Sequence, residues 1–258
     1  MATKSKKTSY DLNAADRRRN LLIQIGLTAI VVLLGVGLVL YIVMGGEKKP
    51  ASGEVKSIQV SSSKLVTKEG STEPKVVVSL YEDFLCPHCR EFEQRFGPTI
   101  NQLIDSGAIA ADYYMVAILD SPSTGNYSSR AGNAAYCVAD ESKDAFRRFH
   151  AALYAQQPGE TGGTYPDDAR LVEVARQAGA GGTVPECINK GRYVSMVQGL
   201  AAATGIQSTP TVKINGQEFD ISTKTPEDLV NEVKSIVGDV PGMMTRPAAP
   251  NPTPPAAP

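Results

Sequence analysis

Two cysteines separated by two residues are the part of this sequence best suited to chemistry. They belong to the tetrapeptide Cys86-Pro87-His88-Cys89. Two cysteines at this spacing can close a disulfide when the second lies one turn into a helix. The first then lies at the helix N-terminus, where free N–H groups and the helix dipole favour a thiolate. Because thiols in such motifs have pKa values lowered to roughly 3.5–7.5, the spacing predicts a reversible dithiol–disulfide pair.

The residues between the cysteines indicate which way electrons flow. Pro87 suits the first helical position, and His88, if protonated or donating a hydrogen bond, would further stabilise an anion at Cys86. A stabilised thiolate is a good leaving group, so such a pair prefers to be reduced and readily passes its disulfide on. We therefore expect oxidation of a substrate dithiol, with Cys86 as the attacked sulfur and Cys89 as the resolving one.

Two other roles for the Cys-x-x-Cys pair are a zinc half-site and an inert structural disulfide. Zinc needs about four ligands, whereas His88 and His150 are the only histidines and the other cysteines stand far apart in the sequence. A structural bridge across two residues is geometrically possible, but this motif beside a strand–helix–strand pattern is typical of redox sites. We expect neither a metal nor a cofactor at the pair.

The elements that must position this motif are predicted from hydrophobic patterning and turn residues. The predicted strands are 57–61, 75–81, 109–119, 211–215 and 218–221, and the predicted helices are 87–104, 128–140, 144–156, 167–178, 184–204 and 226–237. The order strand, motif-bearing helix, strand implies a parallel crossover. Pro98 predicts a kink in that helix, Asn215-Gly216 a tight hairpin, and Thr225 an N-cap.

Thr209-Pro210 is a second informative feature, because Pro210 precedes a predicted strand and cannot donate a hydrogen bond within it. Taken alone, this bond would be an ordinary trans one, as most X–Pro bonds are. Its meaning changes when it is taken together with a Cys-x-x-Cys pair some 120 residues upstream.

The sequence resembles the thioredoxin superfamily, and within it the DsbA-like branch. The features that carry this resemblance are FLCPHC after a Val-rich strand, a long helical stretch, STPTVKING and a last helix. The Pro-His dipeptide matches DsbA itself, and residues 149–157 resemble a helix of membrane-anchored bacterial DsbA-like proteins. The resemblance covers about 55–240 and implies an α/β thioredoxin fold with a helical insertion near 122–206. It also implies that Thr209-Pro210 is cis, faces the disulfide, and offers the Thr209 backbone to a substrate peptide.

Two positions depart from the pattern of that family. Thioredoxin and DsbA carry an acidic residue six positions before the first cysteine, where this chain has Leu80. Proton transfer to Cys89 would then fall to Glu82 or Asp83, of which Asp83 is the better candidate. Thr209 stands where DsbA usually has Val and is typical of disulfide isomerases. Those isomerases use a separate N-terminal dimerisation domain, and the segment between Val43 and Lys75 is too short to be one.

Cys137 and Cys187 lie within or near predicted helices of the insertion and are either bridged or free buried thiols. In an oxidising compartment a bridge is favoured. Closing a loop of that length would contribute about 4 kcal/mol in the chain-entropy model. We therefore expect a structural disulfide there. A second redox relay is the alternative, but these two cysteines lack the Cys-x-x-Cys spacing.

A long apolar run near the N-terminus predicts a membrane anchor. Residues 21–43 carry no charge, and as a helix they would span about 34 Å, enough to cross a bilayer. A buried globular helix would show a polar face, and the apolar part of a cleaved signal peptide is shorter. Arg18-Arg19 faintly resembles a twin-arginine signal. The basic residues of 1–20 instead favour a cytoplasmic N-terminus, which places the rest outside, and the length of the run favours an uncleaved anchor.

The whole chain thus divides into a basic tail (1–20), an anchor (21–43), a linker (44–55), a domain (56–240) and a Pro/Ala-rich tail (241–258) that we expect to be disordered. A net charge of −1 gives no reason to expect a nucleic-acid partner.

The resemblance implies donation of the disulfide to reduced, unfolded secreted proteins and reoxidation by a quinone-linked membrane partner of the DsbB or vitamin-K-epoxide-reductase type. The rivals are a reductase or isomerase on the same fold, and a redox-inactive peptide-binding module.

Overall fold

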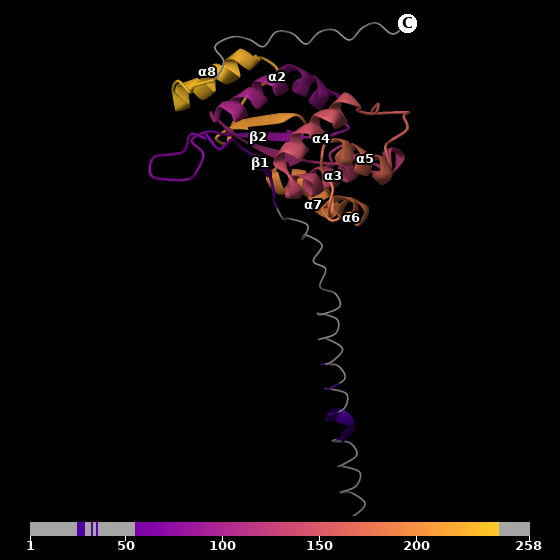
Figure 1. Cartoon of the computed structure of the whole chain (residues 1–258). Helices are drawn as coiled ribbons and strands as arrows, with labels where there is room; N and C mark the ends of the chain where they lie inside the picture. The colour runs from indigo at the N-terminus through magenta and orange to yellow at the C-terminus, as the bar shows by residue number, and fades with distance from the viewer. Residues whose placement is uncertain (1–24, 29–31, 33–34, 36–54, 243–258) are drawn as a thin grey trace, which may run out of the picture. The chain divides into compact units, whose positions relative to one another are not determined.

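The computed structural model of this protein describes residues 25–28, 32, 35 and 55–242, and the last of these ranges holds the folded domain (Figure 1). The predicted basic tail, nearly all of the predicted anchor, most of the linker and the C-terminal tail beyond residue 242 lie outside the described residues. Within the part that is described, no helix is long and apolar enough to cross a membrane. The anchor at 21–43 therefore stays a prediction.

A five-stranded sheet forms the centre of the domain, in the order β1-β3-β2-β4-β5. Its strands are β1 (Ile58–Val60), β2 (Val77–Glu82), β3 (Ala110–Met115), β4 (Thr211–Ile214) and β5 (Gln217–Glu218). β2 pairs with β3 in parallel, whereas its other neighbour, β4, is antiparallel. The parallel pair confirms the predicted crossover, and the central position of β2 explains its apolar sequence, because Val78 and Leu80 are fully buried.

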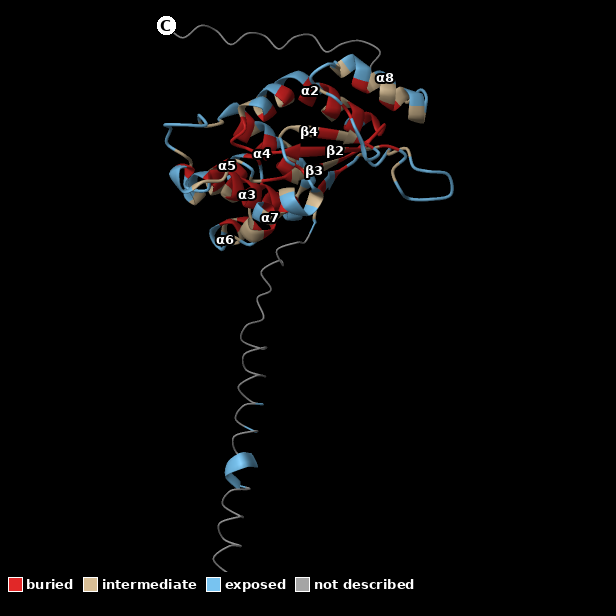
Figure 2. Cartoon of the chain, turned by 180° about the vertical axis from the view of Figure 1, so that it is seen from behind, coloured by how far each residue is buried: buried red, intermediate tan, exposed pale blue. Residues whose placement is uncertain are grey.

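Helix α2 (Pro87–Ser106) starts at the Cys-x-x-Cys motif and lies beside α8 (Pro226–Val237) over one face of the sheet (Figures 1 and 2). It runs unbroken through Pro98 and buries Phe92, Phe96 and Ile100. Helix α8 has the bounds that the sequence predicts. Thr225 caps it, because its side chain accepts a hydrogen bond from the N–H of Asp228 while the Asp228 carboxylate accepts one from the N–H of Thr225.

The helical insertion lies between β3 and β4 in the chain, as the resemblance implied. After a short 3₁₀ turn at Pro122–Thr124, it consists of α3 (Tyr127–Glu141), α4 (Lys143–Ala155), α5 (Asp168–Gln177), α6 (Val184–Asn189) and α7 (Val194–Thr204). Its inner surfaces are continuous with the core of the sheet (Figure 2). Cys137 of α3 and Cys187 of α6 form a disulfide with a Cα–Cα distance of 5.8 Å, which is the bridge that the sequence analysis favoured.

Three predicted elements differ from the structure by more than two residues. The predicted helix 184–204 is two helices, because the chain turns at Gly191, whose φ of 59° favours glycine. The predicted strand 109–119 ends at Met115, since β2 ends at its partner Glu82. The second hairpin strand starts at Gln217, because Asn215 and Gly216 (φ 48° and 83°) form a two-residue turn.

Candidate active site

The two reactive cysteines lie where β2 leads into α2. We call residues 83–86 the catalytic turn, which is closed by a hydrogen bond from the Cys86 N–H to the Asp83 carbonyl (2.9 Å). Cys86 is the N-cap of α2, and Pro87 is its first residue. Cys89 lies one turn further, and its N–H donates to the Cys86 carbonyl (3.1 Å). Both cysteines are free thiols and both are buried, so the predicted geometry is present.

The start of β4 contacts the catalytic turn from the other side. The peptide bond between Thr209 and Pro210 is cis, and the Cys86 sulfur lies 3.4 Å from the Thr209 carbonyl oxygen. The long connection through the insertion thus returns the chain to the motif, as the resemblance implied. The main chain at Thr209 is therefore next to the sulfur at which a mixed disulfide would form.

The surroundings of the two sulfurs are opposite in their electrostatic effect. Hydrogen bonds from the Cys89 thiol, from the Thr209 side chain and from the N–H groups of Cys89 and His88 lower the pKa of Cys86 to about 5, although its burial acts in the other direction. Burial raises the pKa of Cys89 far above its ordinary value, and its hydrogen bond to Cys86 and the charge of Glu82 add to this. Cys86 is therefore the thiolate of the reduced pair and Cys89 the thiol.

His88 contributes to this arrangement in a different way from the one the sequence analysis considered. Its side chain is 77% exposed, and its Nδ1 lies 3.3 Å from a carboxylate oxygen of Glu91. The group that His88 directs at Cys86 is its backbone N–H. The stabilisation therefore comes from the first turn of α2, because helix N-termini carry unpaired N–H groups.

The two acids in front of the motif, Glu82 and Asp83, are both buried. Leu80, which stands at the usual position of the acid in thioredoxin and DsbA, is a buried apolar residue of β2. Asp83 uses both of its carboxylate oxygens to order the loops, since it accepts from the N–H of Leu85 and of Leu119, each at 2.9 Å. Glu82 is different: its Oε1 has no hydrogen-bond partner, and burial raises its pKa to about 8. Glu82 rather than Asp83 is thus the acid with an unengaged oxygen.

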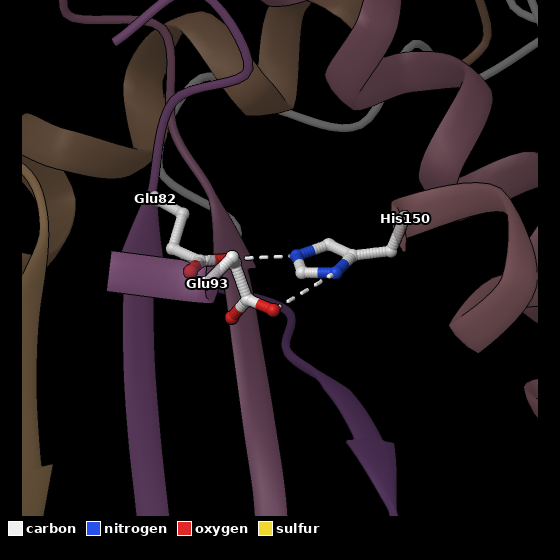
Figure 3. Close-up of side chains that lie close together, drawn as sticks. All are labelled: Glu82, Glu93 and His150. Carbon is white, nitrogen blue, oxygen red and sulfur yellow. Dashed lines mark hydrogen bonds and ion pairs between the residues drawn. The ribbon is translucent and has the colours of Figure 1, made fainter. Parts of the chain in front are cut away.

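Glu82 belongs to a buried cluster with Glu93 of α2 and His150 of α4 (Figure 3). The His150 ring lies between the carboxyls, with Nε2 at 2.7 Å from Glu82 and Nδ1 at 3.9 Å from Glu93. Burial raises the pKa of Glu93 well above its usual value and lowers that of His150. These groups therefore favour their neutral forms, and the three together can exchange a proton without placing several charges in the core.

The same three residues are the described residues that could offer ligands to a metal, because one ligand atom from each lies within 4.8 Å of the others. Ligands of a tetrahedral ion with bonds of about 2.1 Å are about 3.4 Å apart. The 2.7 Å between His150 and Glu82 is instead a hydrogen-bond distance. The two ring nitrogens also point to different carboxyls (Figure 3). The arrangement fits a hydrogen-bonded cluster better than a metal centre.

Glu93 was not predicted from the sequence, and His150 was considered there only as a possible zinc ligand. Gln157 was not predicted either, although its side-chain Nε2 donates to the carbonyls of Phe84 (3.0 Å) and Cys86 (2.9 Å). His150 and Gln157 lie in the segment 149–157 that resembles a helix of DsbA-like proteins. That resemblance was the available signal, but it does not show which residues reach the motif.

Comparisons with known proteins agree with this geometry. A family model described as Thioredoxin matches residues 65–234. The crystal structure of reduced DsbA from Mycobacterium tuberculosis is 58% identical, with a TM-score of 0.71, and covers 73% of this chain and 95% of that one. The reduced disulfide bond oxidoreductase DsbG from the same organism is 57% identical, with a TM-score of 0.71, over 76% of this chain and 95% of that one.

A partial match is to the M. tuberculosis serine/threonine-protein kinase PknE, which is 29% identical over 133 residues. These residues are 50% of this chain but 24% of PknE. The matched part therefore spans about a quarter of that relative's length.

Proposed function

This chain belongs to the DsbA-like thiol–disulfide oxidoreductases of the thioredoxin superfamily, and from that premise we propose that it is an oxidase. In this proposal the Cys86–Cys89 disulfide is donated to reduced secreted or membrane proteins outside the cytoplasm. The observation that carries the proposal is the environment that lowers the pKa of Cys86 to about 5. A stabilised thiolate favours the reduced pair, so the disulfide is a strong oxidant.

The reaction proceeds in two exchanges. A substrate thiolate attacks the Cys86 sulfur, the Cys86–Cys89 bond breaks, and Cys89 receives the electron pair. A second substrate thiolate then attacks the substrate sulfur bonded to Cys86, and Cys86 leaves as a thiolate. The substrate loses two electrons and gains a disulfide, while the cysteine pair gains those two electrons. The Thr209 main chain beside Cys86 is placed to pair with an extended substrate.

Glu82 is the proton-transfer group in this proposal. Cys89 leaves as a thiolate in a buried environment that strongly favours the thiol, so it needs a proton at once. Glu82 interacts electrostatically with Cys89, and it has an unpartnered oxygen. Its pKa of about 8 in the reduced protein keeps it largely protonated at neutral pH. Glu93 and His150 keep that carboxyl in place.

The site of action follows from separate arguments. The Cys137–Cys187 disulfide fits an oxidising compartment, because such bridges are rare in the cytosol. We propose that residues 21–43 anchor the chain with its N-terminus in the cytoplasm. A quinone-linked membrane protein of the DsbB or vitamin-K-epoxide-reductase type would then take the two electrons from the reduced pair. An anchor holds both proteins in one plane and raises their effective concentration.

The alternatives make different predictions. A reductase or isomerase, which Thr209 favours, needs a less stabilised Cys86 thiolate and a more reducing potential. A redox-inactive peptide-binding module would not form mixed disulfides. It is ruled out if a Cys89→Ala variant accumulates substrates bound covalently to Cys86, because the resolving thiol is then missing.

The deciding experiment measures the pKa of Cys86 and the reduction potential on the full-length protein in detergent. Thiolate absorbance at 240 nm, followed against pH, should titrate near pH 5. Equilibration with glutathione buffers should give a potential between about −120 and −180 mV, the range of known disulfide donors. A potential near about −270 mV, as in thioredoxin, would overturn the oxidase proposal.

A further inference from the structure

Gln157 connects the helical insertion to the catalytic turn. It lies two residues beyond the end of α4 (Lys143–Ala155) and is more than 70 residues from the motif in sequence. Its side-chain amide nitrogen donates to the carbonyl oxygens of Phe84 (3.0 Å) and Cys86 (2.9 Å). An amide nitrogen carries two N–H groups, so both are used on the main chain of one short turn.

The two acceptors lie on either side of Leu85, so the amide fixes the backbone that leads into Cys86. Two other bonds lie within the turn: the Cys86 N–H donates to the Asp83 carbonyl, and the Leu85 N–H donates to the Asp83 carboxylate, each at 2.9 Å. The Asp83 carboxylate also accepts from the Leu119 N–H (2.9 Å), and the Cys86 carbonyl also accepts from the N–H groups of Cys89 (3.1 Å) and Arg90 (3.3 Å) in the first turn of α2. Gln157 thus supplies the bonds that tie this turn to the insertion through the Phe84 and Cys86 carbonyls. These carbonyls face the amide, which leaves the Cys86 sulfur on the side of Thr209.

Side chains of α4 reinforce the same attachment. His150 and Tyr154, seven and three residues before Gln157, pack their rings against the Phe84 ring at centroid distances of 5.6 and 5.1 Å. Residues at this spacing lie on one face of a helix. Phe84 is therefore held through its ring by α4 and through its carbonyl by Gln157. A displacement of the end of α4 would be transmitted to the catalytic turn.

We propose that Gln157 is a positioning residue for disulfide exchange: its amide fixes the Phe84 and Cys86 carbonyls and so holds the Cys86 sulfur at the α2 N-terminus, next to Thr209. The proposal rests on the redox function proposed above and adds a residue of the insertion to it. Without the amide, the turn would relax and the alignment of Cys86 with the N–H groups of the first turn would be poorer. Because those N–H groups stabilise the thiolate more than the disulfide, the reduced state would lose more than the oxidised state.

The test compares Gln157→Met with the wild-type protein at full length. Methionine keeps the length and apolar contacts of the side chain but has no N–H donor. We expect the pKa of Cys86 to rise by about one unit and the equilibrium with glutathione to move about tenfold toward the disulfide form, because a less stable thiolate makes a weaker oxidant. Gln157→Glu should change both quantities in the same direction and further, since a carboxylate would face two carbonyl oxygens.

Gln156→Ala is the matched control. This neighbouring glutamine accepts a hydrogen bond from Arg170 through its side-chain oxygen and makes no bond to the catalytic turn. The variant should keep the wild-type thiolate titration and glutathione equilibrium. Unfolding by urea, followed by circular dichroism, reports whether each variant folds and at what cost in stability.

Three outcomes are distinguishable. If Gln157→Met lowers only the unfolding midpoint and leaves the thiolate titration and the glutathione equilibrium unchanged, Gln157 is merely structural and the proposal is wrong. If Gln157→Met does not fold, Gln157→Glu decides the matter by the same two readouts. If the wild-type protein itself shows no glutathione equilibrium, the proposed function fails, whatever the variants do.

Discussion

At the scale of single residues, the two cysteines of the motif differ in what surrounds them. Cys86 lies at a helix N-terminus and receives hydrogen bonds from several donors, whereas Cys89 is fully buried and interacts with the Glu82 carboxyl. The first environment favours an anion and the second a neutral thiol. The reduced pair therefore consists of one thiolate and one thiol, and each turnover has to move a proton to or from Cys89.

This requirement predicts the effect of Glu82→Gln. Glutamine keeps the shape and can still accept the hydrogen bond from His150, but it cannot carry the proton. Closing the disulfide from a Cys86 mixed disulfide requires Cys89 to lose its proton to the Glu82 carboxylate, so the wild-type rate should rise with pH as Glu82 ionises. The midpoint of this rise in rate should lie at or somewhat below pH 8. The reason is that the mixed disulfide lacks the Cys86 thiolate that helps to raise the pKa of Glu82.

We expect Glu82→Gln to remove this pH dependence of the rate. It should also slow formation of the Cys86–Cys89 disulfide from the mixed disulfide by about 100-fold, the lower end of what proton transfer contributes to a rate. The measurement is single-turnover stopped-flow oxidation by glutathione disulfide between pH 5 and 9. Asp83→Asn is the comparison, since Asp83 holds two backbone N–H groups. If the rise in rate with pH persists in Glu82→Gln and disappears in Asp83→Asn, the proton passes through Asp83 instead.

The residues of the site differ in how well the sequence predicted them. Cys86 and Cys89 were predictable because their type and spacing carry the chemistry by themselves, whereas the role of Thr209 and Pro210 was predictable through the family resemblance. Glu93, His150 and Gln157 were not, because a buried acid, a histidine and a glutamine are common, and their meaning depends on how α4 packs against β2 and α2. That packing joins segments more than 50 residues apart and leaves no local pattern in the sequence.

At the scale of elements, the ends of α2 determine where the motif lies. The N-terminal end carries Cys86. The C-terminal end stops at Gly107, whose φ of 81° and whose N–H bonds to the Ile104 and Leu103 carbonyls form the C-cap. A Cβ atom at Gly107 would lie 2.3 Å from the Lys64 carbonyl oxygen. The helix end therefore packs directly on the segment that leads from β1.

This contact predicts that Gly107→Ala destabilises the domain much more than another C-cap glycine would. Gly205, the cap of α7, also has a left-handed φ (70°), but a Cβ there would meet nothing within 4 Å. Gly205→Ala should cost about 1–2 kcal/mol from backbone strain alone. Gly107→Ala adds a backbone clash and should cost more than about 3 kcal/mol. Urea unfolding of both variants measures the difference, and equal losses would show that the clash relaxes.

Element boundaries were predictable where a single residue type enforces them. Thr225 and the Asn215-Gly216 turn are examples, since a cap and a left-handed turn have strong residue preferences. The break at Gly191 was missed, because glycine is also tolerated within helices. The end of β3 was missed because it depends on where its neighbour β2 ends, and a strand cannot continue pairing without a partner.

At the scale of the whole domain, the sheet and the helical insertion depend on one another. The insertion and the sheet share one hydrophobic core. The insertion supplies His150 and Gln157 to the site, and it carries its own disulfide between α3 and α6. The sheet supplies the catalytic turn and Thr209. The helices after β3 could be predicted from their apolar periodicity, whereas their contribution to the active site required the three-dimensional arrangement.

The Cys137–Cys187 disulfide can be tested for a role in stability that is separate from the redox chemistry of Cys86 and Cys89. Replacing Cys137 and Cys187 together by alanine reopens a loop with a sequence separation of 50 residues. The free energy of unfolding should fall by about 4 kcal/mol in the chain-entropy model. Because the bridge joins α3 to α6 rather than to the catalytic turn, the thiolate titration of Cys86 and the glutathione equilibrium should remain those of the wild-type protein.

Stability is measured by urea unfolding with the catalytic pair reduced, so that one disulfide differs between the proteins. A Cys86→Ala, Cys89→Ala protein is the control, because it keeps the structural bridge and lacks the catalytic pair. It should unfold near the wild-type midpoint. A loss of disulfide transfer in the Cys137→Ala, Cys187→Ala variant, at a temperature where it remains folded, would contradict the assignment. It would show instead that the second pair of cysteines takes part in electron transfer.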